Sequence, residues 1–402
     1  ISVVGCGYLG AVHAAVMAER GHEVTGIDVD EAKVEALSAG RAPVYEPGFE
    51  ELLTRALGTG RLRFTTTPGD DLAGVDLHFI AVGTPQSETG AADLSYVDAA
   101  VQTLLAGASP GSVVAGKSTV PVGTAQQVAE RLTGRALVLW NPEFLREGFA
   151  VADTLHPDRI VYGVPADPRD AQEAQTALDA VYQDLLEEGI PRIVTDYPTA
   201  ELVKTAANSF LATKISFINA MAHLCDTAGA DVTVLADAIG HDPRIGRRFL
   251  QAGVGFGGGC LPKDIRAFLA RAKELGVHDA VAFLREVDAI NQRRRDRVVD
   301  LALRSLGDRM PGARVVVLGA AFKPNSDDIR DSPALEVAQR LHDLGAVVTV
   351  TDPKALDAVA KVRPDLPTEA DPIRALTGAD VVVLVTEWED FVQLDPAEVA
   401  AV

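Results

Sequence analysis

The sequence predicts an α/β protein in which two doubly wound domains are joined by a long central helix and a small helical domain. Three observations carry this expectation. Buried-strand and helix patterns alternate through the first half of the chain, the same alternation returns near the end, and one uninterrupted helical pattern lies between them. A chain of 402 residues is long enough for two or three domains with separate cores. We therefore divide it at 1–195, 196–295 and 296–402.

The composition excludes several classes of partner. The formal net charge of −20 argues against nucleic acid and anionic membrane surfaces, because both are themselves negative. No run of about 18 uncharged apolar residues predicts a membrane span, and the opening strand pattern leaves no room for a signal peptide. Three widely spaced cysteines offer neither a disulfide framework nor a metal pattern, and predict a cytoplasmic location: Cys6, Cys225 and Cys260.

The first strand and helix carry a dinucleotide-binding fingerprint. A strand at 1–4 is followed by Gly5-Cys6-Gly7-Tyr8-Leu9-Gly10 and a helix over 11–20, and a second strand at 23–28 ends in Asp28. The glycines let the backbone approach a pyrophosphate, and the carboxylate would hold the adenine ribose and repel the 2′-phosphate of NADP. We therefore predict a Rossmann-like domain that binds NAD. An ordinary glycine turn is the alternative.

Three further strands end in segments with polar residues. Ligands of open parallel sheets bind beyond the carboxyl ends of strands, where such residues would meet them. The strands are predicted at 76–82, 112–117 and 137–140. The candidates after them are Thr84, Thr119, Glu143 and Glu147. Helix capping is the alternative for Thr119 and for Thr124 nearby. Glu143 and Glu147 are four residues apart, so on a helix they would share a face.

The central pattern predicts one long helix over 198–228, capped by Thr195 or Asp196. Its apolar residues spread around more than one side, as in a helix buried between domains or subunits. Lys204 and Asn208 lie side by side on it, and are costly among apolar neighbours unless they are satisfied. A partly exposed polar stripe is the alternative.

A glycine-rich loop precedes the third cysteine. Five glycines in seven positions, from Gly253 to Gly259, form a poor helix or strand, but suit a sharp turn or a backbone that lies against a ligand. Cys260 follows, then Lys263, and a thiol becomes nucleophilic near cations or a helix start. A structural turn with an incidental buried cysteine is the alternative.

Helices are predicted around the loop at 231–239 and 265–275. Before it lie three arginines, which indicate an anion site or a solvated helix face: Arg244, Arg247 and Arg248.

A charged helix predicted over 288–304 leads to a second αβ unit. This unit resembles the first in architecture but lacks the glycine fingerprint, so it should bind something else, or the far side of the same ligands. Lys323 and Arg330 are the cations it could offer. Its strands are predicted at 313–319, 346–351 and 380–385, and its first helix at 334–344.

Together these motifs resemble the UDP-glucose/GDP-mannose dehydrogenase family over nearly the whole chain, and most closely its UDP-glucose 6-dehydrogenase branch. The matching segments are the glycine turn with Asp28, 82–85, 117–124, 141–147, Lys204 with Asn208, 257–264 and 322–330. Segments 144–148 and 157–161 favour the UDP-glucose branch, and 260–264 argues against the branch for N-acetylated sugars.

The resemblance implies a four-electron oxidation, in which two NAD⁺ convert the C6 alcohol of UDP-glucose to the carboxylate of UDP-glucuronate. Cys260 would capture the aldehyde as a thiohemiacetal and carry the later thioester. The base would be Lys204, or a water held by Lys204 and Asp264. Lys204 and Asn208 would stabilise oxyanions. Thr119, Glu147 and Glu143 complete the implied catalytic set, as groups that position water or substrate.

The resemblance also implies two binding sites. The NAD site would comprise Gly5, Gly7, Tyr8, Leu9, Gly10, Asp28, Lys33, Thr84, Thr119, Glu147, Lys263 and Arg330. The substrate site would comprise Phe144, Leu145, Lys204, Asn208, Arg244, Phe249, Gly257 and Lys323. Three positions depart from the usual pattern: Phe249 replaces Tyr, and Gly259 and Leu261 replace Ser and Phe.

Two other functions remain open at this stage. The first is GDP-mannose 6-dehydrogenase, which uses the same chemistry. The second is a sensor that binds NAD and a nucleotide sugar without turnover, although a sensor would not need the thiol. The resemblance also implies a homodimer through the central helix, with Arg244 reaching the partner's site.

Overall fold

The computed structural model describes residues 1–67 and 69–400. The chain forms two compact units, Ile1–Ala206 and Ala207–Val402, and the boundary lies inside helix α9 (Tyr197–Ala228). We describe each unit separately. The division into three domains at residues 195 and 295 stays a prediction.

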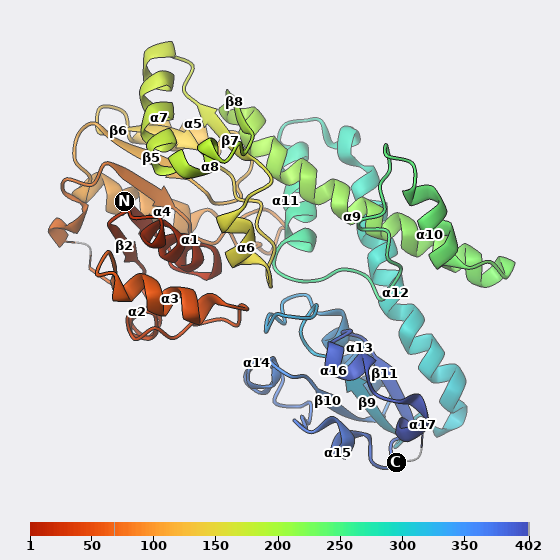
Figure 1. Cartoon of the computed structure of the whole chain (residues 1–402). Helices are drawn as coiled ribbons and strands as arrows, with labels where there is room; N and C mark the ends of the chain where they lie inside the picture. The colour runs from red at the N-terminus through yellow and green to blue at the C-terminus, as the bar shows by residue number, and fades with distance from the viewer. Residues whose placement is uncertain (68, 401–402) are drawn as a thin grey trace. The chain divides into compact units, whose positions relative to one another are not determined.

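The first unit is built on an eight-stranded sheet in the order β3-β2-β1-β4-β5-β6-β7-β8 (Figure 1). Each predicted strand is present within one or two residues of its expected bounds. The strands are β1 (Ser2–Val4), β2 (Val24–Ile27), β3 (Leu62–Thr65), β4 (Leu77–Ile80), β5 (Ser112–Gly116), β6 (Ala136–Trp140), β7 (Ile160–Val164) and β8 (Arg192–Asp196). The first six run parallel, which confirms the α/β class.

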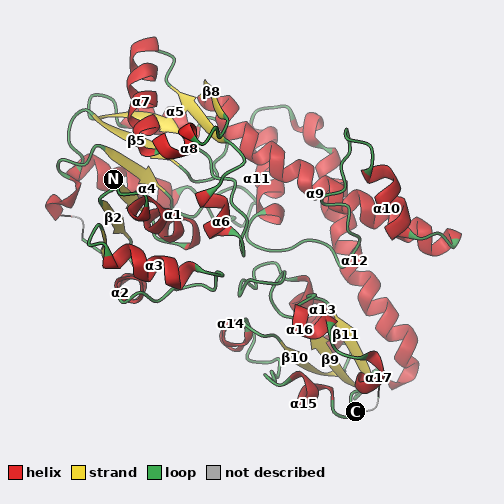
Figure 2. Ribbon diagram, viewed as in Figure 1, coloured by secondary structure: helices red, strands yellow, loops and turns green. Residues whose placement is uncertain are grey.

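Helices cover both faces of this sheet (Figure 2). Alternate residues of each strand enter two different cores, so that Phe79 packs with α1 and α3 while Ile80 packs with α4 and α5. Helix α1 is buried from Gly10 to Ala18, because α3 and α6 cover it. The helices are α1 (Tyr8–Glu19), α2 (Glu31–Ser38), α3 (Phe49–Gly58), α4 (Ser95–Gly107), α5 (Thr124–Arg131), α6 (Ala150–Leu155), α7 (Pro168–Val181) and α8 (Gln183–Glu187).

Two features of this unit do not follow from the sequence patterns. Strand β7 runs antiparallel to β6, and β8 runs parallel to β7, so the last two strands reverse the direction of the sheet. Residues 141–149 form a loop rather than a helix. Glu143 and Glu147 therefore do not share a helical face, because Glu143 accepts hydrogen bonds from the amides that follow it.

The second unit begins within α9 and has a helical part followed by a small sheet. Helix α9 starts at the expected place, since Asp196 accepts a hydrogen bond from the amide of Thr199 at 2.8 Å. Residues from α9, α11 and α12 form a compact apolar cluster with Phe256. The helices of this part are α10 (Val232–Gly240), α11 (Leu261–Glu274) and α12 (Phe283–Leu306).

The small sheet is parallel, in the order β10-β9-β11. Its strands are β9 (Arg314–Leu318), β10 (Val347–Thr351) and β11 (Val381–Leu384), which confirms all three predicted strands. Around it lie α13 (Pro333–Asp343), α14 (Leu356–Val362), α15 (Pro372–Leu376), α16 (Glu389–Val392) and α17 (Pro396–Val399). Asp352 follows β10 as Asp28 follows β2, and its buried carboxylate accepts from four backbone amides and the Trp388 indole.

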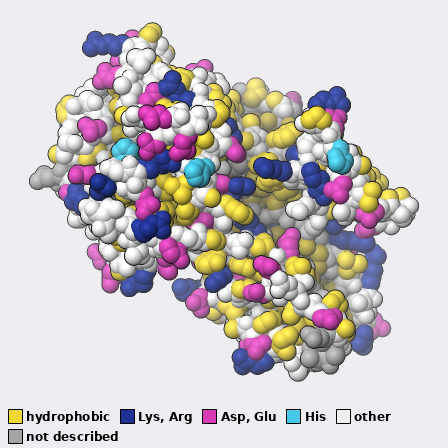
Figure 3. Space-filling view, in the orientation of Figure 1, with side chains coloured by type: hydrophobic (Ala, Val, Ile, Leu, Met, Phe, Trp, Pro, Cys, Tyr) yellow, Lys and Arg dark blue, Asp and Glu magenta, His cyan; other side chains and the backbone are white. Residues whose placement is uncertain are grey.

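The surface carries both signs of charge. Acidic and basic side chains are interspersed over the visible face, although the chain as a whole has a net charge of −20 (Figure 3). Within residues 1–67 and 69–400, no helix has the length and hydropathy needed to cross a bilayer.

Candidate active site

The glycine turn between β1 and α1 has the shape that a pyrophosphate requires. Gly5 has a φ of 95°, and a Cβ at Gly10 would lie 1.8 Å from the carbonyl oxygen of Gly5, so both positions exclude other residues. A Cβ at Gly7 would meet nothing within 4 Å. The backbone is therefore closely packed at Gly5 and Gly10, and has open space at Gly7, at the N-terminus of α1. These residues fit a dinucleotide.

Asp28 lies at the end of β2, beside this turn. One carboxylate oxygen accepts a hydrogen bond from the amide of Cys6 at 2.9 Å, and the Lys33 ammonium lies 2.9 Å from both oxygens. Only 8% of Asp28 is exposed. The structure therefore brings these two predicted cofactor residues together, and Lys33 offsets the charge of the acid.

Glu46 is a neighbour of the turn that sequence reasoning missed. Its buried carboxylate accepts the hydroxyl of Tyr8 and the amides of Gly148 and Ala150. Burial and this hydrogen bond raise the pKa of Tyr8 well above its usual range. Glu46 thus connects the glycine turn to the loop that holds Glu143 and Glu147. The only signal in the sequence is a carboxylate ahead of a Pro-Gly turn.

The loop 141–149 is held by a buried ion pair. The Lys117 ammonium lies 2.9 Å from Glu143, and only 3% of the lysine side chain is exposed. Lys117 also donates to Asn141 and Tyr182 at 3.0 and 3.2 Å. The second oxygen of Glu143 accepts from the amides of Phe144 and Leu145. Every member of this group is therefore matched with a partner.

Electrostatics keep both partners charged. Burial alone would raise the pKa of Glu143, but Lys117, with a smaller contribution from Lys204, lowers it below its ordinary value. Burial would lower the pKa of Lys117, and Glu143 outweighs that effect and raises it. Glu143 is therefore a carboxylate at neutral pH, suited to accept a proton or a hydrogen bond rather than to donate one.

Two cations lie over the ring of Phe144. Arg159 is 3.9 Å and the Lys204 ammonium 5.4 Å from the ring centroid. Lys204 is thus brought to the same loop as Glu143, at the first part of α9. Nearby, Thr84 donates to the carbonyl oxygen of Thr119 at 2.7 Å, so these two predicted residues also lie together.

The remaining predicted residues of this unit occupy less specific positions. Leu9 and Leu145 are half-buried and pack against one apolar core. Glu147 is half-buried in the turn before Gly148. The capping alternative for the threonines is wrong at Thr124, because its hydroxyl donates to Pro121 and Glu201 caps α5 instead.

In the second unit, Cys260 is exposed and lies at the N-terminus of α11. One turn later, Asp264 is only 2% exposed and donates its amide to the carbonyl oxygen of Cys260 at 2.9 Å. Its carboxylate accepts from the Asn208 amide and the Lys263 ammonium, each at 2.6 Å. Three predicted residues, Asn208, Lys263 and Asp264, therefore meet one helical turn after the cysteine. The alternative of an incidental buried cysteine is wrong, because Cys260 is exposed.

The glycines before the cysteine are crowded by the segment 322–332. A Cβ at Gly258 would lie 2.7 Å from the ring of Phe322, and one at Gly259 would lie 2.3 Å from the guanidinium of Arg330. The Lys323 ammonium is 5.3 Å from the Phe322 ring. The loop is therefore glycine-rich because Asp331, Phe322 and Arg330 leave no room for a side chain at its last three positions.

Arg244 and Phe249 lie apart from this group, in the segment before the loop. Arg244 has 87% of its side chain exposed and pairs with Asp242. Phe249 has a φ of 66°, an uncommon conformation for an aromatic residue, and 37% of it is exposed.

Comparison with known proteins agrees with this arrangement. Residues 1–186, 198–293 and 316–402 match, in order, the NAD binding domain, the central domain and the UDP binding domain of the UDP-glucose/GDP-mannose dehydrogenase family. The predicted cofactor and nucleotide-sugar class are thereby confirmed.

Individual relatives cover nearly the whole chain. A UDP-glucose 6-dehydrogenase of Rhizobium meliloti is 43% identical, over 98% of this chain and 91% of its own. One of Bacillus subtilis is 40% identical, over 99% and 86%. A solved UDP-glucose dehydrogenase of Pyrobaculum islandicum is 42% identical and superimposes with a TM-score of 0.91, over 98% and 91%. The chain belongs to the UDP-glucose/GDP-mannose dehydrogenase family.

Proposed function

We propose that this protein oxidises the C6 alcohol of UDP-glucose to the carboxylate of UDP-glucuronate, with two NAD⁺ reduced for each sugar. The observation that carries the proposal is the setting of Cys260. Among the described residues it is the one exposed cysteine. It lies at the N-terminus of α11, one turn before Asp264, whose carboxylate accepts from Asn208. A helix N-terminus favours the thiolate.

The thiol explains how one protein can carry both oxidations. The Cys260 sulfur adds to the aldehyde carbon, and the carbonyl oxygen takes a proton, which gives a thiohemiacetal. Loss of a hydride and a proton then gives a thioester. Water adds to the thioester, the C–S bond breaks, and the acid and the thiol are released. The aldehyde remains bound through the sulfur between the two oxidations.

The other residues have roles that follow from their charge. Asn208 is oriented by Asp264, so its position favours donation to a developing oxyanion. We assign proton transfer to Lys204, alone or through a water shared with Asp264. Glu143, held ionised by Lys117, can accept a proton from the hydrolytic water. Thr119 and Glu147 would place that water.

NAD⁺ would accept the hydride in each oxidation. The glycine turn offers its open face at Gly7, Asp28 offers a carboxylate to the adenine ribose, and Tyr8 is oriented by Glu46. In the second unit, we assign Lys263 and Arg330 to the same cofactor. We assign the nucleotide sugar to Phe144, Leu145, Arg244, Phe249, Gly257 and Lys323.

We also propose that the protein is a homodimer through α9. Phe210, Phe217 and Leu224 are 66%, 47% and 60% exposed, and their spacing of seven residues places them along one stripe of the helix. Three large apolar side chains in one row favour a second copy of the same helix as their partner.

The first experiment is to measure NADH formed per UDP-glucose consumed at completion. We expect a ratio of about two for the wild type, since two hydrides leave the same carbon. Cys260→Ser should form no acid product. Cys225→Ser is the matched control, because Cys225 is buried on α9 and should leave the ratio unchanged.

The same assay separates the alternatives. A ratio of about one with free aldehyde would contradict the covalent route. Turnover of GDP-mannose alone would replace UDP-glucose as the substrate. Tight binding of NAD⁺ and UDP-glucose with no NADH formed would indicate a sensor.

A further inference from the structure

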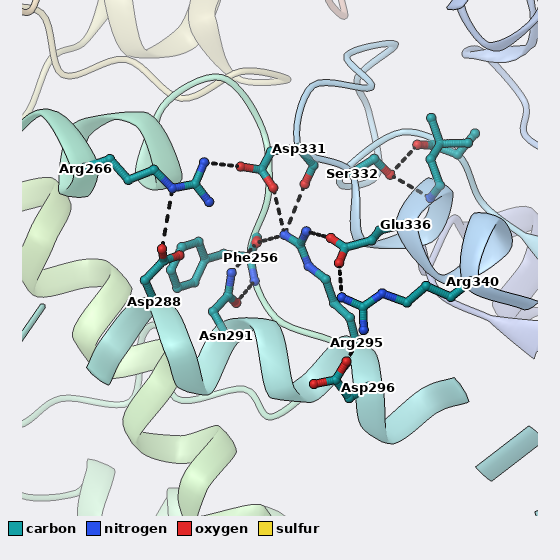
Figure 4. A network of polar contacts seen from close by, with 12 residues as sticks. Phe256, Arg266, Asp288, Asn291, Arg295, Asp296, Asp331, Ser332, Glu336 and Arg340 are labelled. Atoms are coloured by element: carbon teal, nitrogen blue, oxygen red, sulfur yellow. Dashed lines mark hydrogen bonds and ion pairs between the residues drawn. The ribbon is translucent and has the colours of Figure 1, made fainter. Parts of the chain in front are cut away.

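Both sides of Cys260 are tied to a single turn of the segment 322–332. On one side lies the glycine-rich loop, and on the other lies α11, which starts immediately after the cysteine. Each is connected by an arginine to Asp331 (Figure 4). The proposed chemistry uses Cys260, Asn208 and Asp264, and leaves this arrangement unexplained.

The first connection passes through Arg295 of α12. Only 2% of its side chain is exposed, and its guanidinium donates to the carbonyl oxygen of Phe256 at 3.1 Å and to the Asp331 carboxylate at 3.0 Å. Glu336 accepts from the same group. Asn291, one turn earlier, bonds both the amide and the carbonyl of Phe256. The residue four positions before the cysteine is therefore held by α12 on both of its backbone groups.

The second connection passes through Arg266, on the second turn of α11. Its guanidinium donates to the other carboxylate oxygen of Asp331 at 3.0 Å, and pairs with Asp288 of α12. Asp331 thus uses one oxygen for the loop before Cys260 and the other for the helix after it. A carboxylate with both oxygens committed to two arginines is a rigid connector.

Backbone contacts reinforce this connection. The amide of Gly258 donates to the carbonyl oxygen of Arg330 at 2.8 Å. A Cβ at Gly257 would lie 2.3 Å from the carbonyl oxygen of Asp331. The turn itself is fixed, because Ser332 bonds the carbonyl oxygen of Ala320 after β9. The cysteine loop therefore rests on the segment 322–332, which carries both Lys323 and Arg330.

We propose that Asp331 is a positioning residue, which sets the place of Cys260 relative to Lys323 and Arg330 through Arg295 and Arg266. The inference rests on the proposed function. Capture of the aldehyde requires the sulfur within bonding reach of C6 while the nucleotide end of the substrate is held elsewhere. Asp331 would fix that separation, and would affect aldehyde capture more than the first oxidation, which makes no bond to sulfur.

Asp331→Asn is the test. The residue has a φ of 50°, a conformation that asparagine tolerates well, so the variant keeps the backbone and volume and removes the charge. We expect free aldehyde, trapped with a hydrazine reagent, and an NADH yield per sugar that falls from about two toward one. We also expect acid formation to slow by about 10- to 100-fold.

Arg340→Gln is the matched control. Arg340 belongs to the same network, but its guanidinium pairs with Glu336 and Asp296 rather than with Phe256 or Asp331 (Figure 4). It should retain the wild-type NADH yield. A partly unfolded variant would lose rate but keep that yield, so the yield separates positioning from general stability.

Alkylation of Cys260 by iodoacetamide gives a second readout that does not depend on turnover. Peptide mass spectrometry should show that Asp331→Asn changes the rate several-fold, whereas Arg340→Gln does not. A wild-type yield of NADH and a wild-type alkylation rate in Asp331→Asn would overturn the inference alone. A wild-type protein that fails to give two NADH would overturn the proposed function, and the alkylation rate would still decide whether Asp331 positions the thiol.

Discussion

Lys117 and Glu143 form a buried pair whose members depend on each other. The lysine is 3% and the glutamate 13% exposed at the side chain, so removal of one leaves the other with a poorly solvated charge. Glu143 has a lowered pKa in the folded protein, and the stability that this provides is present above the ordinary carboxyl pKa of 4.5 and is lost as the pH falls.

Lys117→Met should therefore lower the free energy of unfolding by about 3–5 kcal/mol at neutral pH. The difference from the wild type should shrink as the pH falls and Glu143 takes a proton. The pKa of Glu143 should rise without its cation, so the acid limb of the product-formation rate should move to higher pH. Urea unfolding and a pH–rate profile measure the two effects.

The double variant Lys117→Met with Glu143→Gln is the control for this prediction. It removes both charges, so it should recover part of the stability lost in Lys117→Met. Equal losses in the single and double variants would mean that packing, not charge, dominates at this position.

Residues in a local motif were predictable, and residues that meet only through the fold were not. Asp28 and Cys260 stand at fixed spacings from glycines, so their positions followed from the sequence. Lys117 lies 26 residues from Glu143 (143 − 117), and Glu46 lies 102 residues from Gly148. The local sequence does not show what either residue pairs with, because burial and pairing arise only when the strands assemble.

At the scale of elements, α9 stabilises another helix through Glu201. Its carboxylate is 2% exposed and accepts from the amides of Gly123 and Ala125 at 2.7 Å each, at the start of α5. Gly123 is the N-cap of α5 and brings no side chain of its own. A residue three positions before Lys204 therefore holds the segment that follows Thr119.

Glu201→Gln should lower the free energy of unfolding by about 1–3 kcal/mol. A glutamine side chain has one accepting oxygen, whereas the backbone amides of Gly123 and Ala125 need one each. Activity should also fall, since the start of α9 carries Lys204. Chemical denaturation and steady-state kinetics give the two results. Glu130→Gln, an exposed change on α5 itself, should leave both unchanged. A wild-type midpoint in Glu201→Gln would contradict the capping role.

Element type was easier to predict than element direction. The helix at 198–228 and the strands of both sheets follow from the hydrophobic periodicity of the sequence and from the residues that start and stop each element. The strand direction reverses at β7 because of the path that the chain takes after Trp140, and no local sequence pattern predicts this path. The spacing of Glu143 and Glu147 would suit one face of a helix. Pro142 and the side-chain hydrogen bonds of Glu143 keep residues 141–149 in a loop instead.

At the scale of the whole molecule, the predicted site residues are divided between the two compact units. Lys204 and Glu143 belong to the first, and Asn208, Cys260 and Asp264 to the second. The division falls within α9, so this helix carries one predicted catalytic residue on each side of the boundary. The proposed dimer would place a further copy of α9 beside the same helix.

The proposed dimer leads to a complementation experiment. Arg244→Met and Cys260→Ser should each be inactive alone. The first variant lacks the cation proposed to bind the nucleotide sugar, and the second lacks the proposed nucleophile. If Arg244 serves the partner's site, a mixed dimer has one complete site. Random exchange of equal amounts should then restore about a quarter of the wild-type activity, since about half of the dimers are mixed.

Phe217→Asp provides the control for assembly. A charge in the centre of the exposed apolar stripe should favour the monomer, which light scattering on a size-exclusion column measures. Added to both inactive variants, it should abolish the recovery. If mixing restores no activity although the two variants form mixed dimers, Arg244 acts within its own chain. If Phe217→Asp remains dimeric, the contact lies elsewhere than this stripe of α9.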